Sequence, residues 1–299
     1  MKILLTGRTG QVGHELGRSL QGLGEIVALD RSQMDLADLD QVRDVIRQIK
    51  PNLIVNPAAY TAVDKAESEP ALASLINGQA PAVMAEEAQK LGAAMIHYST
   101  DYVFDGSKST PYSEQDTPNP QSVYGRTKQE GDAAVASLCQ AHWIFRTSWV
   151  YGVHGGNFLK TILRLAQERD SLRIVADQAG APTWARTIAK ATADAMRAQS
   201  DVMAGIREKA GIYNLSASGS ATWHAYATHI VKWAHDKGLP LKLAPEAIVP
   251  IATEEYPLPA PRPRNSRLLN QKIEQAFHLA LPRWDQDLDS CLRELFPEA

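Results

Sequence analysis

The chain has 299 residues, which is long enough for one large α/β domain or for two smaller interleaved ones. Its content of 44% hydrophobic and 22% charged residues is typical of a globular protein, and the net charge of -3 argues against a nucleic-acid-binding surface. No apolar run approaches the roughly 20 residues that span a bilayer, and the first run is too short for a signal peptide. Cys139 and Cys291 form no metal-binding or redox spacing, so the expected location is the cytoplasm.

In the first half, short apolar runs alternate with amphipathic helical patterns. The runs that predict buried strands are residues 2–6, 25–30, 52–59, 93–100 and 142–149. The helical patterns between them are residues 12–23, 39–50, 71–92 and 125–139. Strands that alternate with helices form a parallel sheet covered on both faces, so we predict an α/β fold with a doubly wound, Rossmann-type sheet. Ligands of such sheets bind beyond the carboxyl ends of the strands.

The second half is less regular. Its patterns predict helices at 157–169, 186–198 and 224–237, and strands at 172–175 and 212–216. A passage rich in proline and arginine follows at 249–266. We expect that passage to be ordered against another part of the chain.

The first predicted strand ends in the glycine-rich stretch "TGRTGQVG". Gly7, Gly10 and Gly13 are spaced three apart, with Gln11 and Val12 between the last two. Glycine allows a sharp turn and a close backbone approach, and the N-terminus of the following helix attracts a pyrophosphate. The spacing is G-x-x-G-x-x-G rather than the strict G-x-G-x-x-G, and a plain strand-to-helix turn is the alternative. The position between a strand and an amphipathic helix favours a dinucleotide site.

The second predicted strand ends at Asp30, whose carboxylate could accept hydrogen bonds from an adenosine ribose and so favour NADH. Arg31 follows it, and Arg8 lies in the glycine loop. Either guanidinium could pair with a 2′-phosphate, so NADPH stays a candidate beside NADH. Asp35 and Leu36 are placed to border the adenine, although Asp35 could instead cap a helix.

The stretch "SVYGRTKQE" holds Tyr124 and Lys128 four residues apart. On a helix these side chains share one face, and an ammonium near a phenol lowers the pKa of the phenol toward the range of an acid–base catalyst. A Y-x-x-x-K pattern alone is also consistent with an ordinary exposed helix face. The other motifs of the chain are needed to distinguish a catalytic pair from an exposed helix face.

Taken together, the glycine pattern, "STDYVFDG" and "YGRTK" resemble the extended short-chain dehydrogenase/reductase family. Further blocks are similar to its dTDP-4-dehydrorhamnose reductase branch, which completes dTDP-L-rhamnose synthesis. These blocks are "NPAAYTAVDKAESEP", "HYSTDYVFDG", "FRTSWVYG", "DQAGAPT" and "RPRNSRL". The resemblance implies a Rossmann domain at 1–148, to which 184–217 return, and a smaller α/β substrate-binding domain formed mainly by 149–299.

The resemblance also implies roles for single residues. Tyr124 would donate a proton to the C4 ketone of dTDP-4-dehydro-L-rhamnose, Lys128 would hold the nicotinamide ribose and acidify Tyr124, and Thr100 would hydrogen-bond the substrate oxygen. The residues that would line NADPH or NADH are Ala59, Tyr60, Thr61 and Tyr98. The residues that would contact the sugar nucleotide are Asp101 and Trp149. Local alternatives are a strand-end cap for Thr100 and core packing for Trp149.

The phosphates of the substrate need cationic partners. Arginine suits them by geometry as well as by charge. The candidates are Arg186, Arg262, Arg264 and Arg267, with Arg262 taken as the substrate contact. A solvated basic face is the alternative.

Other activities of the family place limits on the interpretation. Related dehydratases carry a glutamate base where this chain has Tyr102, which is a poor base near neutral pH. Simple reduction therefore remains, with an epimerase or a nucleotide-binding regulatory subunit as alternatives. The family is also associated with Mg²⁺ and with homodimers. Glu15 could contribute to such a metal site, but Arg186 stands where another acid would be needed, so we predict no metal ligands.

Overall fold

A six-stranded sheet forms the centre of the computed structural model, which describes residues 1–297. The strand order is β10-β5-β4-β3-β1-β2, and every neighbouring pair is parallel. The strands are β1 (Lys2–Leu5), β2 (Glu25–Ala28), β3 (Leu53–Asn56), β4 (Ala94–Thr100), β5 (His142–Thr147) and β10 (Gly211–Asn214). The predicted α/β fold with a doubly wound sheet is confirmed. The strand order reverses between β1 and β3, which is where such sheets bind ligands.

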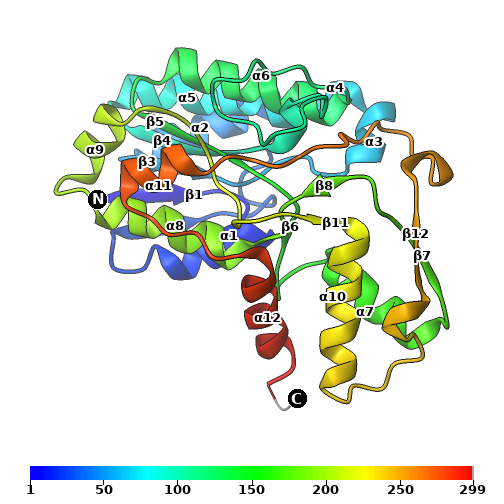
Figure 1. The fold of residues 1–299 in the computed structure, drawn as a ribbon. Helices are drawn as coiled ribbons and strands as arrows, with labels where there is room; N and C mark the ends of the chain where they lie inside the picture. Colours follow the sequence, from blue (N-terminus) through cyan, green and yellow to red (C-terminus); the bar gives the residue numbers. More distant parts are fainter. Residues whose placement is uncertain (298–299) are drawn as a thin grey trace.

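Helices cover both faces of this sheet (Figure 1). On one face lie α2 (Leu39–Ile49), α5 (Ala80–Leu91) and α6 (Val123–Leu138); on the other lie α1 (Gln11–Ser19), α8 (Ala185–Arg197), α9 (Val202–Glu208) and α11 (Gln271–Phe277). The alternation of side chains along β1 divides them between the two layers, since Leu4 packs in one core and Ile3 and Leu5 pack in the other. Both faces of the strands are thus apolar, as the sequence indicated.

Local capping explains where several helices begin. The Asp38 side chain accepts a hydrogen bond from the Gln41 amide at the start of α2, and Ser122 accepts one from Gly125 at the start of α6. The Ser122 cap sets the residue at which α6 begins, so Tyr124 lies in its first turn. The spacing of four residues then places Tyr124 and Lys128 on one face of the helix.

The single helix predicted at 71–92 is divided into three parts. They are α4 (Pro70–Ser74), the π-helical turn η1 (Leu75–Gln79) and α5, preceded by α3 (Val63–Ser68). The π-turn contains the buried Asn77, whose side-chain oxygen accepts a hydrogen bond from the Tyr60 amide at 2.8 Å. Such turns are often found at functional sites.

The second half builds a separate aromatic core around α7 (Phe158–Glu168), α10 (Trp223–Asp236) and α12 (Trp284–Leu295). Short strand pairs border it: β6 (Val150–Tyr151) with β9 (Thr183–Trp184), β7 (Leu172–Val175) with β12 (Ile248–Ile251), and β8 (Ala179–Gly180) with β11 (Ala221–Thr222). Single turns are η2 (Asp101–Val103), η3 (Pro245–Ala247) and η4 (Thr253–Glu255). The periodicity did not reveal α9, α11 or α12.

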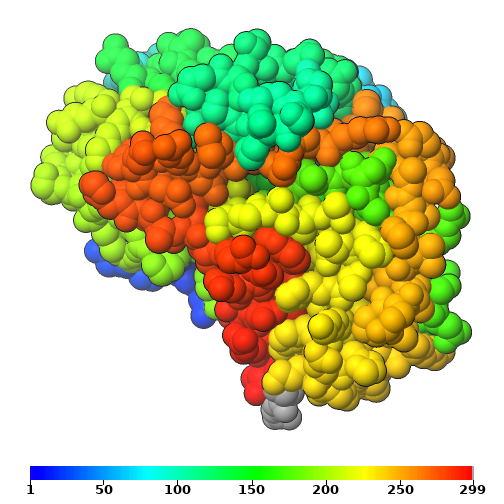
Figure 2. Space-filling view, in the orientation of Figure 1, coloured from blue at the N-terminus to red at the C-terminus, as the bar shows by residue number. Residues whose placement is uncertain are grey.

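The proline-rich passage is ordered, as expected. It begins as β12 against β7, and the Ser266 amide later donates to the Ala179 carbonyl at 2.7 Å. Figure 2 shows this orange segment passing between the green helix layer and the yellow helix α10. Within residues 1–297, no helix combines the length and apolarity that crossing a membrane requires.

Candidate active site

A cleft of about 690 Å³ runs along the carboxyl ends of β1, β3, β4 and β5. Most of the predicted site residues line it. They are Gly7, Gly10, Gln11, Val12, Gly13, Ala59, Thr61, Tyr98, Thr100, Asp101, Tyr124, Lys128 and Trp149. Their roles stay predictions, but the fold brings them to one place from segments that are far apart in the sequence.

The glycine loop is packed too closely for side chains. Gly7 has a φ of +57°, and a Cβ at Gly13 would lie 2.1 Å from the Gly7 carbonyl oxygen. Gly10 precedes α1 and provides no capping side chain. The first N–H groups of α1 therefore have no capping side chain. Free N–H groups at a helix N-terminus can donate to an anionic pyrophosphate.

A smaller adjoining cavity of about 310 Å³ lies beyond the end of β2. Its wall includes the other predicted cofactor residues, namely Asp30, Arg31, Asp35, Leu36 and Tyr60. Both arginines considered for a 2′-phosphate are engaged with carboxylates. Arg8 Nη2 lies 2.7 Å from Asp30 Oδ2, and Arg31 Nε lies 3.2 Å from Asp35 Oδ2. Hydrogen bonds from Ser32 and then Arg8 hold the pKa of Asp30 below its ordinary value.

Tyr124 lies in the first turn of α6, opposite the end of β4. The Thr100 hydroxyl donates to Asp101 Oδ1 at 3.0 Å and accepts from the Tyr102 amide at 3.2 Å. Burial raises the pKa of Tyr124, and a hydrogen bond with Thr100 opposes that rise. The phenol is therefore protonated at neutral pH and can serve as an acid.

The predicted acidification of Tyr124 by Lys128 stays a prediction. The Lys128 ammonium is buried and donates to the Tyr98 carbonyl at 2.7 Å, with His97 Nε2 at 3.3 Å. Burial lowers the pKa of Lys128 to about 8. The influence that opposes the rise in the Tyr124 pKa comes from a hydrogen bond with Thr100.

Asp101 lies at the bottom of the cleft as a buried carboxyl. The Ser148 hydroxyl donates to its Oδ2 at 3.3 Å. Burial raises the pKa of Asp101 to about 6, while hydrogen bonds from Ser266 and Thr100 oppose the rise. A carboxyl with this pKa can change protonation when a ligand alters its surroundings.

Trp149 adopts a left-handed backbone conformation, with a φ of +46°. Its ring stacks on Trp223, with the centroids 3.6 Å apart and the planes within 9°. A Cβ at Gly180 would come within 2.5 Å of the Trp149 ring. A strained non-glycine backbone of this kind is often found where a side chain must point into a site. The sequence offered no signal for Trp223.

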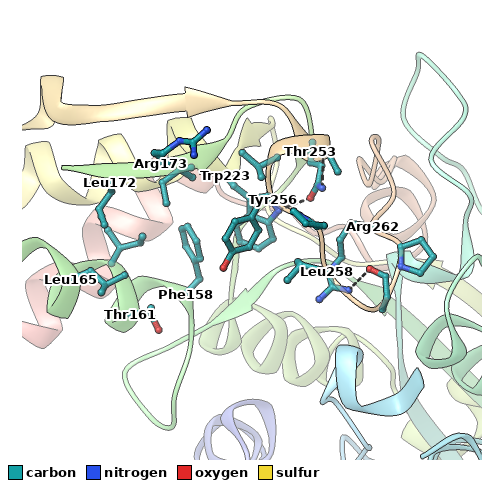
Figure 3. Close-up of a pocket in the computed structure, with 17 residues that line it drawn as sticks. Phe158, Thr161, Leu165, Leu172, Arg173, Trp223, Thr253, Tyr256, Leu258 and Arg262 are labelled. Carbon is teal, nitrogen blue, oxygen red and sulfur yellow. Dashed lines mark hydrogen bonds between the residues drawn. The ribbon is translucent and has the colours of Figure 1, made fainter. Parts of the chain in front are cut away.

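Trp223 also borders a third cavity of about 540 Å³, shown in Figure 3. Its wall is largely apolar and includes Phe158, Leu165, Leu172, Tyr256 and Leu258. Arg262 lines this cavity, and its predicted contact with the substrate stays a prediction. Its guanidinium donates to Asp64 Oδ2 and to the Ala260 carbonyl, each at 2.8 Å.

The other candidate phosphate-binding arginines are paired elsewhere. Arg264 contacts Glu254, and Arg267 donates to the Ser109 carbonyl. Arg186 bridges Glu15, with Nε 3.0 Å from Oε2, and Glu294. Glu15 therefore has a cationic partner in the chain itself. Residues 1–297 contain no cluster of three acidic, histidine or cysteine side chains suited to a metal ion.

The sequence reasoning missed a buried polar cluster behind Lys128. It consists of His97 on β4, Asn56 on β3, Asp132 on α6 and Arg146 on β5. The one available signal was the spacing of four between Lys128 and Asp132, which places both on one helix face.

Comparisons with known proteins agree along the whole chain. The model of the family described as "RmlD substrate binding domain" matches residues 1–296. A dTDP-4-dehydrorhamnose reductase from Burkholderia thailandensis is 46% identical over 299 residues, covering 100% of both chains.

Solved structures give the same result. A dTDP-4-dehydrorhamnose reductase from Clostridium acetobutylicum is 35% identical, with a TM-score of 0.88 and 99% of both chains covered. One from Bacillus anthracis, in complex with NADP, is 33% identical, with a TM-score of 0.88 and coverage of 98% of this chain and 99% of that one. The chain therefore belongs to the RmlD substrate-binding-domain family, in which these similar relatives are dTDP-4-dehydrorhamnose reductases.

Proposed function

We propose that this chain catalyses the NAD(P)H-dependent reduction of the C4 ketone of dTDP-4-dehydro-L-rhamnose, which yields dTDP-L-rhamnose. The observation that carries the proposal is a single cleft lined by Thr100, Tyr124, Lys128 and the glycine loop. The family relationship supports the substrate class, since relatives named for this reaction match over the full chain.

The cleft suits a dinucleotide by shape. The glycine loop provides no side-chain cap at the start of α1, so the first N–H groups of this helix can bind a pyrophosphate. Bound nicotinamide supplies the hydride. Asp30 suits ribose hydroxyls, while Arg8 suits a 2′-phosphate once it leaves Asp30, so we propose that NADPH and NADH are both used. The NADP in the Bacillus anthracis relative supports the first of these.

Negative charge develops on the ketone oxygen as its carbon becomes tetrahedral. Tyr124 donates its phenolic proton to this oxygen, and the Thr100 hydroxyl turns from Asp101 to donate a hydrogen bond to it. A positioned acid of this kind typically contributes about 10²–10⁴-fold. Lys128 holds the ribose and stabilises the phenolate that remains after proton transfer.

Tyr102 favours reduction over dehydration. It occupies the position of the glutamate base of related dehydratases, and burial raises its pKa. A phenol of this kind does not remove a proton near neutral pH. The epimerase and regulatory-subunit alternatives have no comparable observation in their favour.

The nucleoside end of the substrate is proposed to extend past Trp149 and Trp223 into the third cavity. Trp223 borders both spaces, and its ring can stack on a base or a sugar. Arg262 donates to Asp64 and Ala260 but has five N–H donors in total, so it can also contact a phosphate.

The proposal extends to organisation and location. Two interleaved domains, 1–148 with 184–217 and the remainder of 149–299, are supported by the pairing of β10 with β5 and the packing of α8 on α1. A cytoplasmic location and a homodimer belong to the same proposal. Sedimentation velocity would test the dimer.

The decisive experiment combines the purified chain, NADPH and dTDP-4-dehydro-L-rhamnose. We expect oxidation of NADPH in step with formation of dTDP-L-rhamnose, and no 4-keto-6-deoxy product from dTDP-glucose. Binding of NADPH without turnover at saturating substrate would instead support a regulatory subunit.

A further inference from the structure

Lys128 is held from behind by two acceptors on β4. Its side chain is 1% exposed, and its ammonium donates to the Tyr98 carbonyl at 2.7 Å. The second neighbour is His97 Nε2 at 3.3 Å. An ammonium has three N–H donors, and leaving them without acceptors in a buried site is costly. The imidazole is therefore part of what makes a charged Lys128 tolerable there.

His97 is itself fixed on its other side. It is fully buried, and its Nδ1 lies 3.1 Å from Asn56 Nδ2, while the Thr6 hydroxyl donates to Asn56 Oδ1 at 2.6 Å. An imidazole that accepts at Nε2 must carry its proton at Nδ1. The Asn56 amide can accept from that N–H when its oxygen and nitrogen ends are exchanged, because Nδ2 then donates to the Thr6 hydroxyl oxygen.

The charges around the pair keep the imidazole neutral. Burial, and next the charge of Lys128, hold the pKa of His97 well below its ordinary value. Asp132 Oδ1 lies 3.9 Å from His97 Nε2 and has no hydrogen-bond partner. Asp132 Oδ2 accepts from Ser99 at 2.7 Å and faces Arg146 Nε at 3.5 Å, and the charge of Asp132 also favours the ammonium form of Lys128 by raising its pKa.

We propose that His97 is a positioning residue for Lys128, whose neutral imidazole accepts a hydrogen bond from the ammonium, keeps it charged and holds it at the wall of the cleft. The inference rests on the proposed function, in which Lys128 holds the cofactor ribose and stabilises the Tyr124 phenolate. A neutral Lys128 amine would not stabilise the phenolate, and it would form weaker hydrogen bonds with the ribose than the ammonium does.

Several titratable groups face this site from the surrounding elements. They are Tyr124 and Asp132 on α6, His97 on β4, Arg146 on β5 through Asp132, and Asp101 on η2 through Tyr124. Among them, His97 is the neutral side chain within hydrogen-bonding reach of the ammonium, so its replacement changes an acceptor without changing the local charge.

The test compares two substitutions of similar size. His97→Gln keeps an acceptor at the position of Nε2, whereas His97→Leu removes it. His142→Gln is the matched control, because His142 is a buried histidine on the adjacent β5 that faces the Cys139 carbonyl at 2.6 Å. Lysine labelled with ¹³C at Cε reports the charge of Lys128 by NMR, and Lys128→Met assigns its signal.

We expect Lys128 to titrate near pH 8 in the wild type, in His97→Gln and in His142→Gln. In His97→Leu its midpoint should fall by about one pH unit or more, since a hydrogen bond that favours the ammonium is lost. The basic limb of the pH profile of kcat/KM should move the same way, and NADPH affinity at pH 8 should fall about tenfold.

An unchanged Lys128 midpoint in a folded His97→Leu variant would overturn the proposal. If that variant does not fold, His97→Asn replaces it, because the shorter amide is polar but does not reach Lys128. The NMR titration and NADPH binding need no turnover. Failure of the proposed reaction would appear as an inactive wild type with a normal Lys128 titration, so the two failures are distinguishable.

Discussion

The cleft and the aromatic cavity are built in opposite ways. The cleft lies at the ends of parallel strands, and every residue of β4 is buried beneath it. The cavity is walled by rings and by the 253–262 segment, in which Tyr256 is 55% and Leu258 is 40% exposed. A sheet positions side chains for chemistry, because paired backbone on both sides fixes each strand. A loop of rings and prolines provides adaptable contact with a ligand instead.

Trp223 belongs to both regions and is the place where they meet. It stacks on Trp149 of the cleft and donates from Nε1 to Gln178 at 3.2 Å. Changes in the cleft should therefore affect the chemical step, whereas changes in the cavity should affect substrate binding. The following predictions test this division.

The largest effect is expected from Tyr124→Phe. The ring still fills its space, so folding and NADPH affinity should change little, but no acid remains for the developing alkoxide. Turnover should fall about 10²–10⁴-fold, with residual activity owing to Thr100. Single-turnover oxidation of NADPH measures it. Tyr213→Phe is the control, since it removes a hydroxyl that donates to the Lys209 carbonyl away from the cleft. Near-wild-type turnover in Tyr124→Phe would mean that Tyr124 is not the acid and that the Y-x-x-x-K motif is an ordinary helix start.

A smaller effect, on substrate affinity, is expected from Trp223→Leu. Loss of the ring should raise the KM for the sugar nucleotide about 10-fold or more, while NADPH affinity stays close to wild type. Trp233→Leu on the same helix is the control, because Trp233 packs against Phe296 instead. Steady-state kinetics of the two variants would separate them. A fall in kcat with an unchanged KM in Trp223→Leu would contradict the proposal that the cavity affects substrate binding and the cleft affects the chemical step.

Asp30→Ala, at the cofactor end of the cleft region, should alter the preference between NADH and NADPH. NADH loses its ribose acceptor, while Arg8 loses its carboxylate partner and becomes available to a 2′-phosphate. The ratio of kcat/KM for NADPH to that for NADH should rise several-fold, up to about tenfold. A greater loss with NADPH than with NADH would contradict the assignment of Asp30.

The smallest effect concerns the contact between α8, which covers the central sheet, and α12 of the second-half core. Thr187 on α8 donates to both Asp287 carboxyl oxygens of α12, at 2.8 and 2.7 Å, and burial raises the pKa of Asp287 from 3.8 to about 6. The native state thus prefers the protonated carboxyl. Its contribution to stability is complete below about pH 4 and is lost as pH rises through about 6.

Asp287→Asn should remove this pH dependence. The variant should match the wild type at pH 4 and be about 1 kcal/mol more stable at pH 8, because a neutral amide avoids the buried charge and can still accept from Thr187. Urea unfolding at both pH values measures it. An equal change in the free energy of unfolding at pH 4 and pH 8 would show that the substitution acts through packing and not through ionisation of Asp287.

Local signals were enough for the first half of the fold. Apolar runs, helix periodicity and the glycine loop indicated β1 to β5 and the cleft, because strand burial and turn geometry depend on neighbouring residues. The resemblance then named the residues that line the cleft. The same signals failed at the π-turn around Asn77, because helix periodicity does not show where one extra residue is accommodated.

The contacts that complete the site depend on residues distant in sequence, and only the tertiary structure decided them. Arg262 donates to Asp64 across 198 residues, and His97 contacts Asn56 across 41. Lys128 turns to the Tyr98 carbonyl because its buried ammonium needs acceptors that β4 presents. Spacing along the chain shows which side chains share a face, but the partner that a buried charge selects depends on what the packed sheet brings within hydrogen-bonding distance.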